Sequence, residues 1–226
     1  MRILGLDTAT RRASVGLLTD GKVVTTKSQA VEGSHAVSLL PLIEAVLQEA
    51  GCATRDLDAV AVSRGPGSFT GLRVGLSVAK GLAYATGVRV IGVPTLEALA
   101  RTVTDHRGVV CALLDARKGE LYAACFEPSA TIPRRLTPDM LVTPASLVER
   151  LPTPCVILGD AVETYGEFLQ ARLGSRVTLL PYDSHGPCGG VVATMGWERL
   201  RAGPGDDLTP LEPVYIRSSE AERKMA

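Results

Sequence analysis

The chain has 226 residues, of which 46% are hydrophobic and 21% charged, a size and composition typical of a soluble globular protein with one domain or two small ones. Its formal net charge of zero excludes a strong overall attraction to nucleic acid or to an anionic membrane, so any RNA contact is expected to be local or made by a partner. No apolar run reaches the roughly 18 residues of a membrane-spanning helix and no signal-peptide pattern is present, so we expect a cytoplasmic protein without a membrane partner.

Three strands are predicted first. Apolar runs at residues 2–7, 13–18 and 23–28 indicate them, and Asp20-Gly21 between the last two is a strong signal for a tight hairpin turn.

A helix is predicted after these strands. Ser34 is placed to cap it, apolar residues from 36 to 50 recur at helical spacing, and Gly51 ends it. Pro41 lies inside this pattern and predicts a kink or a late start of the helix.

The next segment is the most informative one in the chain. A strand at residues 57–63 leads into the turn Gly65-Pro66-Gly67, after which Ser68 or Thr70 can cap a second helix. One side of this helix carries a ridge of small residues, namely Gly71, Gly75, Ala79 and Ala83. An interior glycine costs roughly 1 kcal/mol relative to alanine. Another backbone is therefore expected close to this ridge, either the protein's own sheet or a partner's helix.

The pattern then repeats in a shorter form. After a strand at 88–93 and a short helix, further strands are predicted at 108–114, 121–126, around 142, at 156–158 and at 177–180, with helices at 144–150, around 160–169 and at 191–200. The first strand of each half ends in an aspartate, Asp7 or Asp115, which suggests a duplication. We predict an N-terminal lobe of residues 1–104 and a C-terminal lobe of residues 105–226 with an extended tail.

The two strand ends are candidates for phosphate chemistry. Asp7, Thr8 and Thr10 offer the carboxylate and hydroxyl oxygens that suit a hydrated magnesium ion and a phosphate, and Asp115 would be the matching ligand across a cleft. An ordinary strand end with Asx and Thr turns explains the same residues equally well.

Familiar catalytic motifs are not found. Leu72 and Arg73 follow Gly71 where a P-loop needs Lys and Ser or Thr, and no GxGxxG follows the first strand. Leu39 stands four residues after His35, where a helical metal site needs a second histidine. No catalytic residue and no metal ligand is assigned.

The five cysteines contain no CxxC pair, so disulfides and a zinc site are not expected. Cys111, Cys125 and Cys155 lie in apolar strand-like runs, which favours buried packing over reactivity.

Five blocks of the sequence, in order, are similar to the TsaB (YeaZ) family. They are residues 3–10, 34–41, 63–73, 92–99 and 114–122, and a weaker similarity is found again at residues 213–217. The glycine-proline-glycine block is the most specific of them. The resemblance implies an α/β fold of two related lobes of the actin-like, hexokinase and Hsp70 (ribonuclease H-like) type.

The resemblance also implies a role in forming threonylcarbamoyladenosine in tRNA. The family's catalytic paralogue TsaD carries a metal-binding histidine pair and joins the threonylcarbamoyl group to adenosine 37, and the small ATPase TsaE joins them. ATP and metal are thus expected on the partner subunits, with tRNA reached through the complex. In family members the first two helices form the contact between subunits, which gives either a TsaB homodimer or the TsaB–TsaD heterodimer.

On this basis a partner-binding surface is assigned to the two helices, comprising Ala36, Leu39, Leu40, Ile43, Val46, Gly71, Gly75, Val78, Ala79 and Leu82. Replacing Gly75 by leucine is accordingly expected to leave the monomer folded and to weaken association.

The departures from active relatives predict a non-catalytic scaffold. Leu39 replaces a second metal ligand, and the adenine-binding double glycine is reduced to Gly159-Asp160, which leaves the aspartates and threonines at the strand ends as a vestigial nucleotide site. Two alternatives remain: an ATP-dependent transferase or kinase of the same fold that acts by itself through Asp7 and Asp115, and a glycoprotease-like metallopeptidase.

Overall fold

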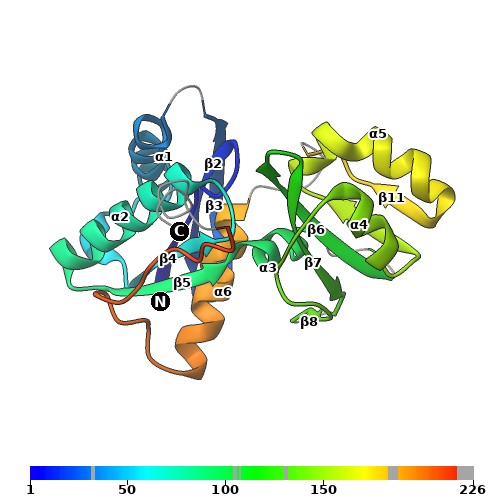
Figure 1. Cartoon of the computed structure of the whole chain (residues 1–226). Coiled ribbons are helices and arrows are strands. Elements are labelled where there is room, and N and C mark those ends of the chain that lie inside the picture. The colour runs from blue at the N-terminus through cyan, green and yellow to red at the C-terminus, as the bar shows by residue number, and fades with distance from the viewer. Residues whose placement is uncertain (32–33, 104–105, 107, 130–131, 183–187, 218–226) are drawn as a thin grey trace. The chain divides into compact units, whose positions relative to one another are not determined.

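A computed structural model of the chain describes residues 1–31, 34–103, 106, 108–129, 132–182 and 188–217 (Figure 1). The chain forms two compact units. Unit 1 comprises residues 1–98 and 187–213, and unit 2 comprises residues 99–186 and 214–226. The boundary expected after residue 104 thus lies after residue 98, and the segment 187–213, which we expected in the C-terminal lobe, belongs to unit 1.

Unit 1 is built on a five-stranded mixed sheet of order β3-β2-β1-β4-β5. Its strands are β1 (Arg2–Asp7), β2 (Arg12–Thr19), β3 (Lys22–Ala30), β4 (Ala59–Gly65) and β5 (Arg89–Pro94). Strand β2 runs antiparallel to its neighbours β1 and β3, and β4 and β5 run parallel to β1. Asp20 and Gly21 both have positive φ angles, 49° and 80°, so the predicted hairpin turn is confirmed.

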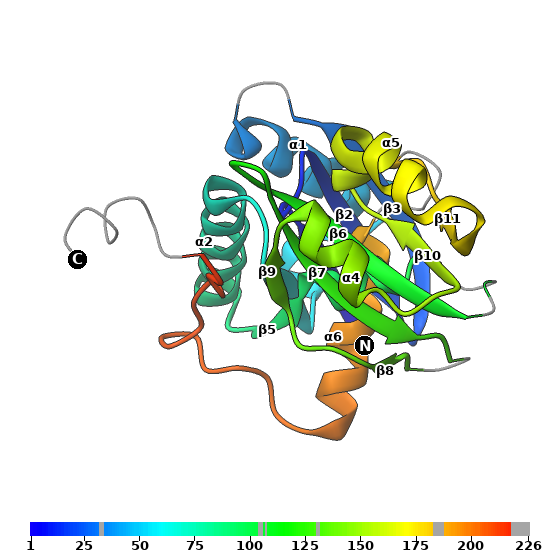
Figure 2. The ribbon, with the colours of Figure 1, turned by 45° about the vertical axis from the view of Figure 1, so that its right-hand side comes forward.

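Helices cover both faces of this sheet (Figures 1 and 2). They are α1 (His35–Glu49), α2 (Phe69–Thr86) and α6 (Cys188–Ala202), with a 3-10 turn η1 (Thr54–Asp56) before β4 and a short α3 (Thr95–Ala100) at the unit boundary. The α1 and α2 helices lie on one face and α6 lies on the other. Unit 1 is therefore a sheet between two helical layers.

The predicted helix caps are confirmed. Ser34 accepts the N–H of Ala36 at 3.3 Å, and Ser68 accepts the N–H of Gly71 at 3.2 Å. The late start expected at Pro41 is wrong, because α1 already begins at His35. Proline leaves the carbonyl four residues earlier, that of Val37, without a helical partner, but both residues are exposed, so water can bond that carbonyl.

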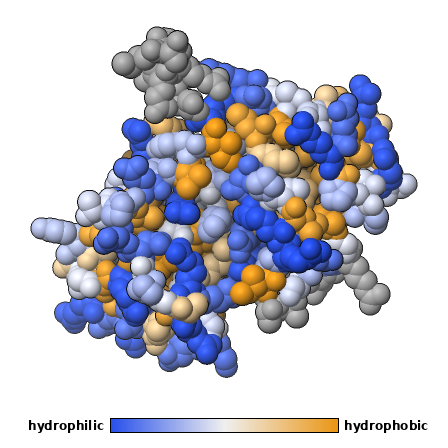
Figure 3. Space-filling model, turned by 60° about the horizontal axis from the view of Figure 1, so that its bottom comes forward, coloured by the Kyte–Doolittle hydropathy of each residue, from blue (hydrophilic) through white to orange (hydrophobic). Residues whose placement is uncertain are grey.

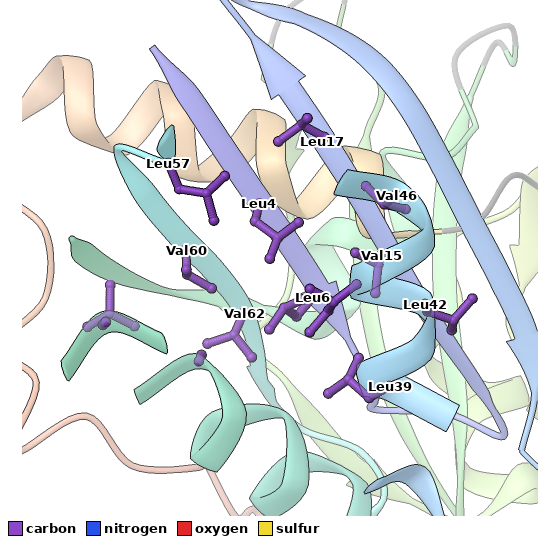
Figure 4. Close-up of a cluster of buried hydrophobic side chains, with 14 of the residues drawn as sticks. Leu4, Leu6, Val15, Leu17, Leu39, Leu42, Val46, Leu57, Val60 and Val62 are labelled. Atoms are coloured by element: carbon purple, nitrogen blue, oxygen red, sulfur yellow. The ribbon is translucent and has the colours of Figure 1, made fainter. Parts of the chain in front are cut away.

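The core of unit 1 follows the alternation of the strands. Leu4 and Leu6 of β1 point toward α1 and α2, where they pack with side chains of β2, β4 and α1, as Figure 4 shows. Gly5, between them, points to the opposite face, where its position meets α6. Each face of β1 is therefore buried under a different helical layer.

Helix α6 lies unusually close to the sheet. A Cβ atom on Gly5 would lie 2.2 Å from the carbonyl oxygen of Gly189, and one on Gly16 would lie 2.4 Å from the nitrogen of Gly190. Glycines on both partners thus allow backbone to contact backbone. This packing is the physical reason why α6 joins unit 1 although it follows the strands of unit 2 in the sequence.

Unit 2 has a six-stranded sheet of order β11-β10-β6-β7-β8, with β9 also paired to β7. Its elements are β6 (Val109–Arg117), β7 (Glu120–Glu127), β8 (Arg134–Arg135), β9 (Met140–Val142), α4 (Pro144–Arg150), β10 (Cys155–Leu158), α5 (Ala161–Leu173), η2 (Gly174–Arg176) and β11 (Val177–Leu179). Read from β8 to β11, the strands have the order and directions of β3 to β5 in unit 1. The predicted repeat is thus confirmed.

The cysteines are free thiols, and the prediction that three of them pack in a core is confirmed. Cys111 and Cys125 face each other on β6 and β7, and all three thiols lie in the core of unit 2. Burial raises the pKa of Cys155 to about 12, so this thiol stays protonated and unreactive at neutral pH.

Within the described residues, no helix is long and apolar enough to cross a membrane. On the face shown in Figure 3, hydrophobic groups are interspersed with hydrophilic side chains.

Candidate functional site

The first candidate site lies at the end of β1, where Asp7 is only 3% exposed. Its Oδ1 accepts the N–H of Ala9 at 3.2 Å. Burial raises the pKa of Asp7, and the nearby groups of Ser63, Ala9 and Cys188 oppose this rise in part. The Oγ of Ser63 makes no hydrogen bond of normal geometry with the described residues. Sequence reasoning missed the contact with Cys188, although Gly189-Gly190 after it signals a close approach.

Replacing Asp7 by asparagine tests this burial. Because the folded pKa lies above the unfolded value of about 4, the free energy of unfolding of the wild type should fall as the pH rises from that value to the raised folded pKa. The Asp7→Asn variant has no charge to bury, so it should gain stability relative to the wild type over this interval. Urea unfolding of both proteins at a series of pH values measures the difference, and a difference that shrinks with rising pH would contradict the prediction.

The two threonines of this site are engaged inside unit 1. Thr8 donates from Oγ1 to the carbonyl oxygen of Gly71 at 2.8 Å, and Thr10 exchanges hydrogen bonds with the backbone of Arg12. The Nε2 of His35 lies 2.8 Å from the carbonyl oxygen of Thr10. Because a carbonyl only accepts, His35 donates from Nε2 and joins the start of α1 to the loop after β1.

Asp115, the fourth predicted residue, belongs to unit 2, where β6 approaches its hairpin turn. Its Oδ1 accepts the N–H of Arg117 at 2.7 Å, and its own N–H donates to Asp160 at 3.0 Å. Arg117 also forms an ion pair with Oδ2 of Asp115 at 3.1 Å. The structure brings Asp7, Thr8 and Thr10 together, whereas Asp115 lies in the other unit.

The same hairpin holds the last described residue, Arg217. Its guanidinium pairs with Glu120 and donates to the carbonyl oxygen of Ala116 at 2.6 Å. Across the part of the chain that the structure describes, no three His, Cys, Asp or Glu side chains are grouped so that they could hold a metal ion.

The second candidate site is the pair of helices α1 and α2, and here most of the predicted contact residues are misassigned. The residues buried inside unit 1 are Leu39, Ile43, Val46, Gly71, Gly75 and Ala79. A Cβ on Gly71 would lie 2.0 Å from the carbonyl oxygen of Thr8, and one on Gly75 would lie 2.3 Å from Thr8 Oγ1. The small-residue ridge therefore packs against the protein's own β1 and cannot receive a partner's helix.

A different surface of the same two helices is open. Among the predicted residues, Ala36 and Leu40 are exposed and Val78 and Leu82 are half-buried. Sequence reasoning missed Val37, Phe69, Gly81 and Tyr84, which are also exposed. The signal available in the sequence was the presence of apolar residues on the solvent-facing side of a helix, where polar residues are expected. We call these eight residues the exposed helix face.

Large apolar side chains dominate the exposed helix face. Leu40 is 57% exposed, Val37 72% and Tyr84 85%. A Cβ on Gly81 would meet nothing within 4 Å, so α2 presents bare backbone there. The two helices contact each other and lie side by side in Figure 1. Exposed large apolar side chains on two neighbouring helices favour a protein–protein contact.

Comparisons with known proteins show which family the chain resembles. The family model described as TsaD, tRNA N6-adenosine threonylcarbamoyltransferase, matches residues 25–224. The chain is 32% identical to the tRNA threonylcarbamoyladenosine biosynthesis protein TsaB of Escherichia coli, with 100% of this chain and 98% of that protein covered. It is 39% identical to the protein of the same name from Haemophilus influenzae, with 100% and 97% covered.

Solved structures show the same fold. YeaZ from Pseudomonas aeruginosa has a TM-score of 0.78 and 30% identity, with 95% of this chain and 99% of that chain covered. Component A of (R)-2-hydroxyglutaryl-CoA dehydratase from Acidaminococcus fermentans has a TM-score of 0.55 at 11% identity, with 89% and 99% covered. The expected α/β fold of two related lobes of the actin-like type is confirmed.

Proposed function

The chain belongs to the TsaB (YeaZ) family of tRNA threonylcarbamoyladenosine biosynthesis proteins, and from this membership we propose that it is a non-catalytic accessory subunit of that pathway. In this proposal it binds a TsaD paralogue and keeps that enzyme competent on tRNA. The observation that carries the proposal is the exposed helix face, a set of exposed apolar side chains on the two helices that the family resemblance assigns to subunit contact.

The absence of catalysis is supported by the strand ends. The side chains that would hold magnesium and phosphate are engaged in bonds within their own units: Asp7 is buried, Thr8 bonds to Gly71, and Asp115 pairs with Arg117. An ATPase site needs such oxygens open toward its ligand. We therefore assign ATP and metal to the partner subunits, TsaD and TsaE, and treat these residues as vestigial.

The physical drive for association is the burial of apolar surface. Exposed leucine, valine and tyrosine side chains gain roughly 25 cal/mol for each Å² removed from water. A second copy of the chain offers the same face, so in this proposal the isolated protein is a homodimer and the catalytic paralogue replaces one copy. With a formal net charge of zero, the chain supplies no general attraction to tRNA, which is reached through the complex.

A pull-down with the catalytic paralogue, followed by a tRNA modification assay with and without this chain, tests the proposal. We expect stable capture, and modified adenosine only when both proteins and the ATPase are present. Modification of tRNA by the chain alone would overturn it. ATP turnover by the chain alone that Asp7→Ala abolishes would favour the independent transferase or kinase instead.

A further inference from the structure

One edge of the sheet in unit 1 is closed by a single backbone bridge and a pair of charged side chains rather than by a full strand. Strand β5 is the last in the order, so one row of its backbone groups points away from β4. The N–H of Asp206 donates to the carbonyl oxygen of Val90 at 2.8 Å, and the N–H of Gly92 donates to Asp206 Oδ2 at 2.6 Å. Arg199 donates from Nη1 to the carbonyl oxygen of Gly92 at 2.5 Å. Three consecutive outward groups of β5 are thus satisfied by two residues.

The two residues also hold each other. Arg199 and Asp206 form a bidentate ion pair, with Nη2 to Oδ1 at 2.8 Å and Nη1 to Oδ2 at 3.0 Å. Such a fork fixes orientation as well as charge. Arg199 stands on the last turn of α6, and Asp206 stands in the segment that follows this helix. The pair therefore ties that segment to β5.

The segment of residues 203–211, which we call the edge segment, is anchored further along. Leu211 is buried in the core of unit 1, and Lys80 of α2 donates to the carbonyl oxygen of Thr209 at 3.3 Å. Gly205 is close to β5, since a Cβ there would lie 2.9 Å from the carbonyl oxygen of Val90. The edge segment therefore covers β5 along its middle residues.

The opposite edge of the sheet, β3, is protected differently. Its pairing with β2 shifts register between Leu17 and Leu18, because Val24 is an extra residue on β3. A bulge of this kind bends an edge and discourages pairing with another strand. The pairing of β5 with β4 is regular from Arg89 to Val93, and its residues 90–93 are uncharged and mostly β-branched. An uncovered β5 would therefore be a good template for strand addition.

We propose that Arg199 and Asp206 guard the edge of β5, and that without this pair unit 1 adds the β5 strand of a second copy of the chain. A second copy is the natural occupant because two identical edges pair antiparallel about a twofold axis without any new sequence. The resulting dimer does not use the exposed helix face, since none of the eight residues of that face lies on β5. The inference holds whether or not the chain serves a tRNA-modifying enzyme.

The full-length Asp206→Ala variant tests the guard, with Asp207→Ala as the matched control, since Asp207 is an exposed neighbour of the same charge. In the Asp206→Ala variant, hydrogen exchange at the Gly92 amide should quicken at least about tenfold, because its acceptor is gone. Sedimentation velocity should show self-association at about 100 µM beyond that of the wild type, a concentration at which open strand edges associate. The control should match the wild type in both measurements.

Two further variants test whether the changes come from loss of the Arg199–Asp206 pair rather than from another cause. Arg199→Lys keeps the charge but loses the fork, so it should show the same changes in milder form even where Asp206→Ala does not fold. Adding Leu40→Glu to Asp206→Ala should leave the extra association in place, because the edge and the exposed helix face are different surfaces. Slow exchange at Gly92 in both edge variants, faster exchange without extra association, or loss of the association with Leu40→Glu would each overturn the proposal.

Discussion

Replacing Gly75 by leucine is expected to unfold unit 1, with a loss of at least about 3 kcal/mol in the free energy of unfolding. The first atom of the new side chain would lie 2.3 Å from Thr8 Oγ1 and 3.5 Å from Val62 Cγ2. Thr8 cannot turn away freely, since Oγ1 donates to the carbonyl oxygen of Gly71 at 2.8 Å. Leucine would therefore push α2 off β1 and β4. Urea unfolding followed by far-UV circular dichroism measures the loss.

Gly81→Leu is the matched control for this substitution. Gly81 lies on the same helix, but a Cβ there meets nothing within 4 Å. Leucine is a better helix former than glycine by somewhat less than about 1 kcal/mol, so this variant should be as stable as the wild type or more stable. A Gly75→Leu protein that unfolds at the wild-type urea concentration would mean that the ridge is free, as the sequence alone led us to expect.

Replacing Leu40 by glutamate is expected to weaken binding of the TsaD paralogue by roughly 30- to 1,000-fold, the range of about 2–4 kcal/mol for a central contact residue. The reason is that a carboxylate would have to be buried at the centre of an apolar contact. Since Leu40 is 57% exposed, the fold should be unaffected. Isothermal titration calorimetry with the purified paralogue measures the affinity, and circular dichroism checks the fold.

Val24→Glu is the control for the charge change. Val24 is 55% exposed and lies on β3 of the same unit, outside the exposed helix face. Its replacement should leave the affinity within a few-fold of the wild type. Equal affinity of the Leu40→Glu and wild-type proteins would move the contact to another surface, and equal losses in both variants would show that the negative charge acts at long range.

The secondary structure could be predicted because its signals are local. Asp20 and Gly21 specify their hairpin by positive φ angles, and Ser34 and Ser68 specify helix starts by bonding amides two or three residues away. Gly87 ends α2 in the left-handed conformation, with φ at 73°. None of these features depends on distant parts of the chain.

The candidate contact surface was harder to predict from the sequence, because both sides of α2 carry small or apolar residues. Spacing shows that Gly71 and Gly75 share one side of the helix, but it does not show what lies against that side. The answer depends on Thr8, more than 60 residues earlier, whose side chain reaches the carbonyl oxygen of Gly71 (separation 63). Gly81 and Tyr84, on the other side, were overlooked because one glycine and one tyrosine do not form a periodic pattern.

Two further features could not be predicted because they depend on contacts between residues even farther apart in the sequence. The contact of Gly92 with Arg199 joins residues 107 apart, and that of Ser14 with Gly189 joins residues 175 apart. No local pattern predicts contacts over such separations, since they depend on how complete units pack. The edge segment and the destination of α6 were consequently visible only in the structure.

The backbone contact between α6 and the first sheet also affects the order in which the molecule assembles during synthesis. A ribosome makes the five strands of unit 1 within the first 94 residues, yet the helix that covers their glycine-bearing side ends at Ala202. All strands and helices of unit 2 have been translated by then. One side of the sheet of unit 1 therefore stays uncovered until α6 has been translated, so this sheet is completed only after the strands and helices of unit 2 have been made.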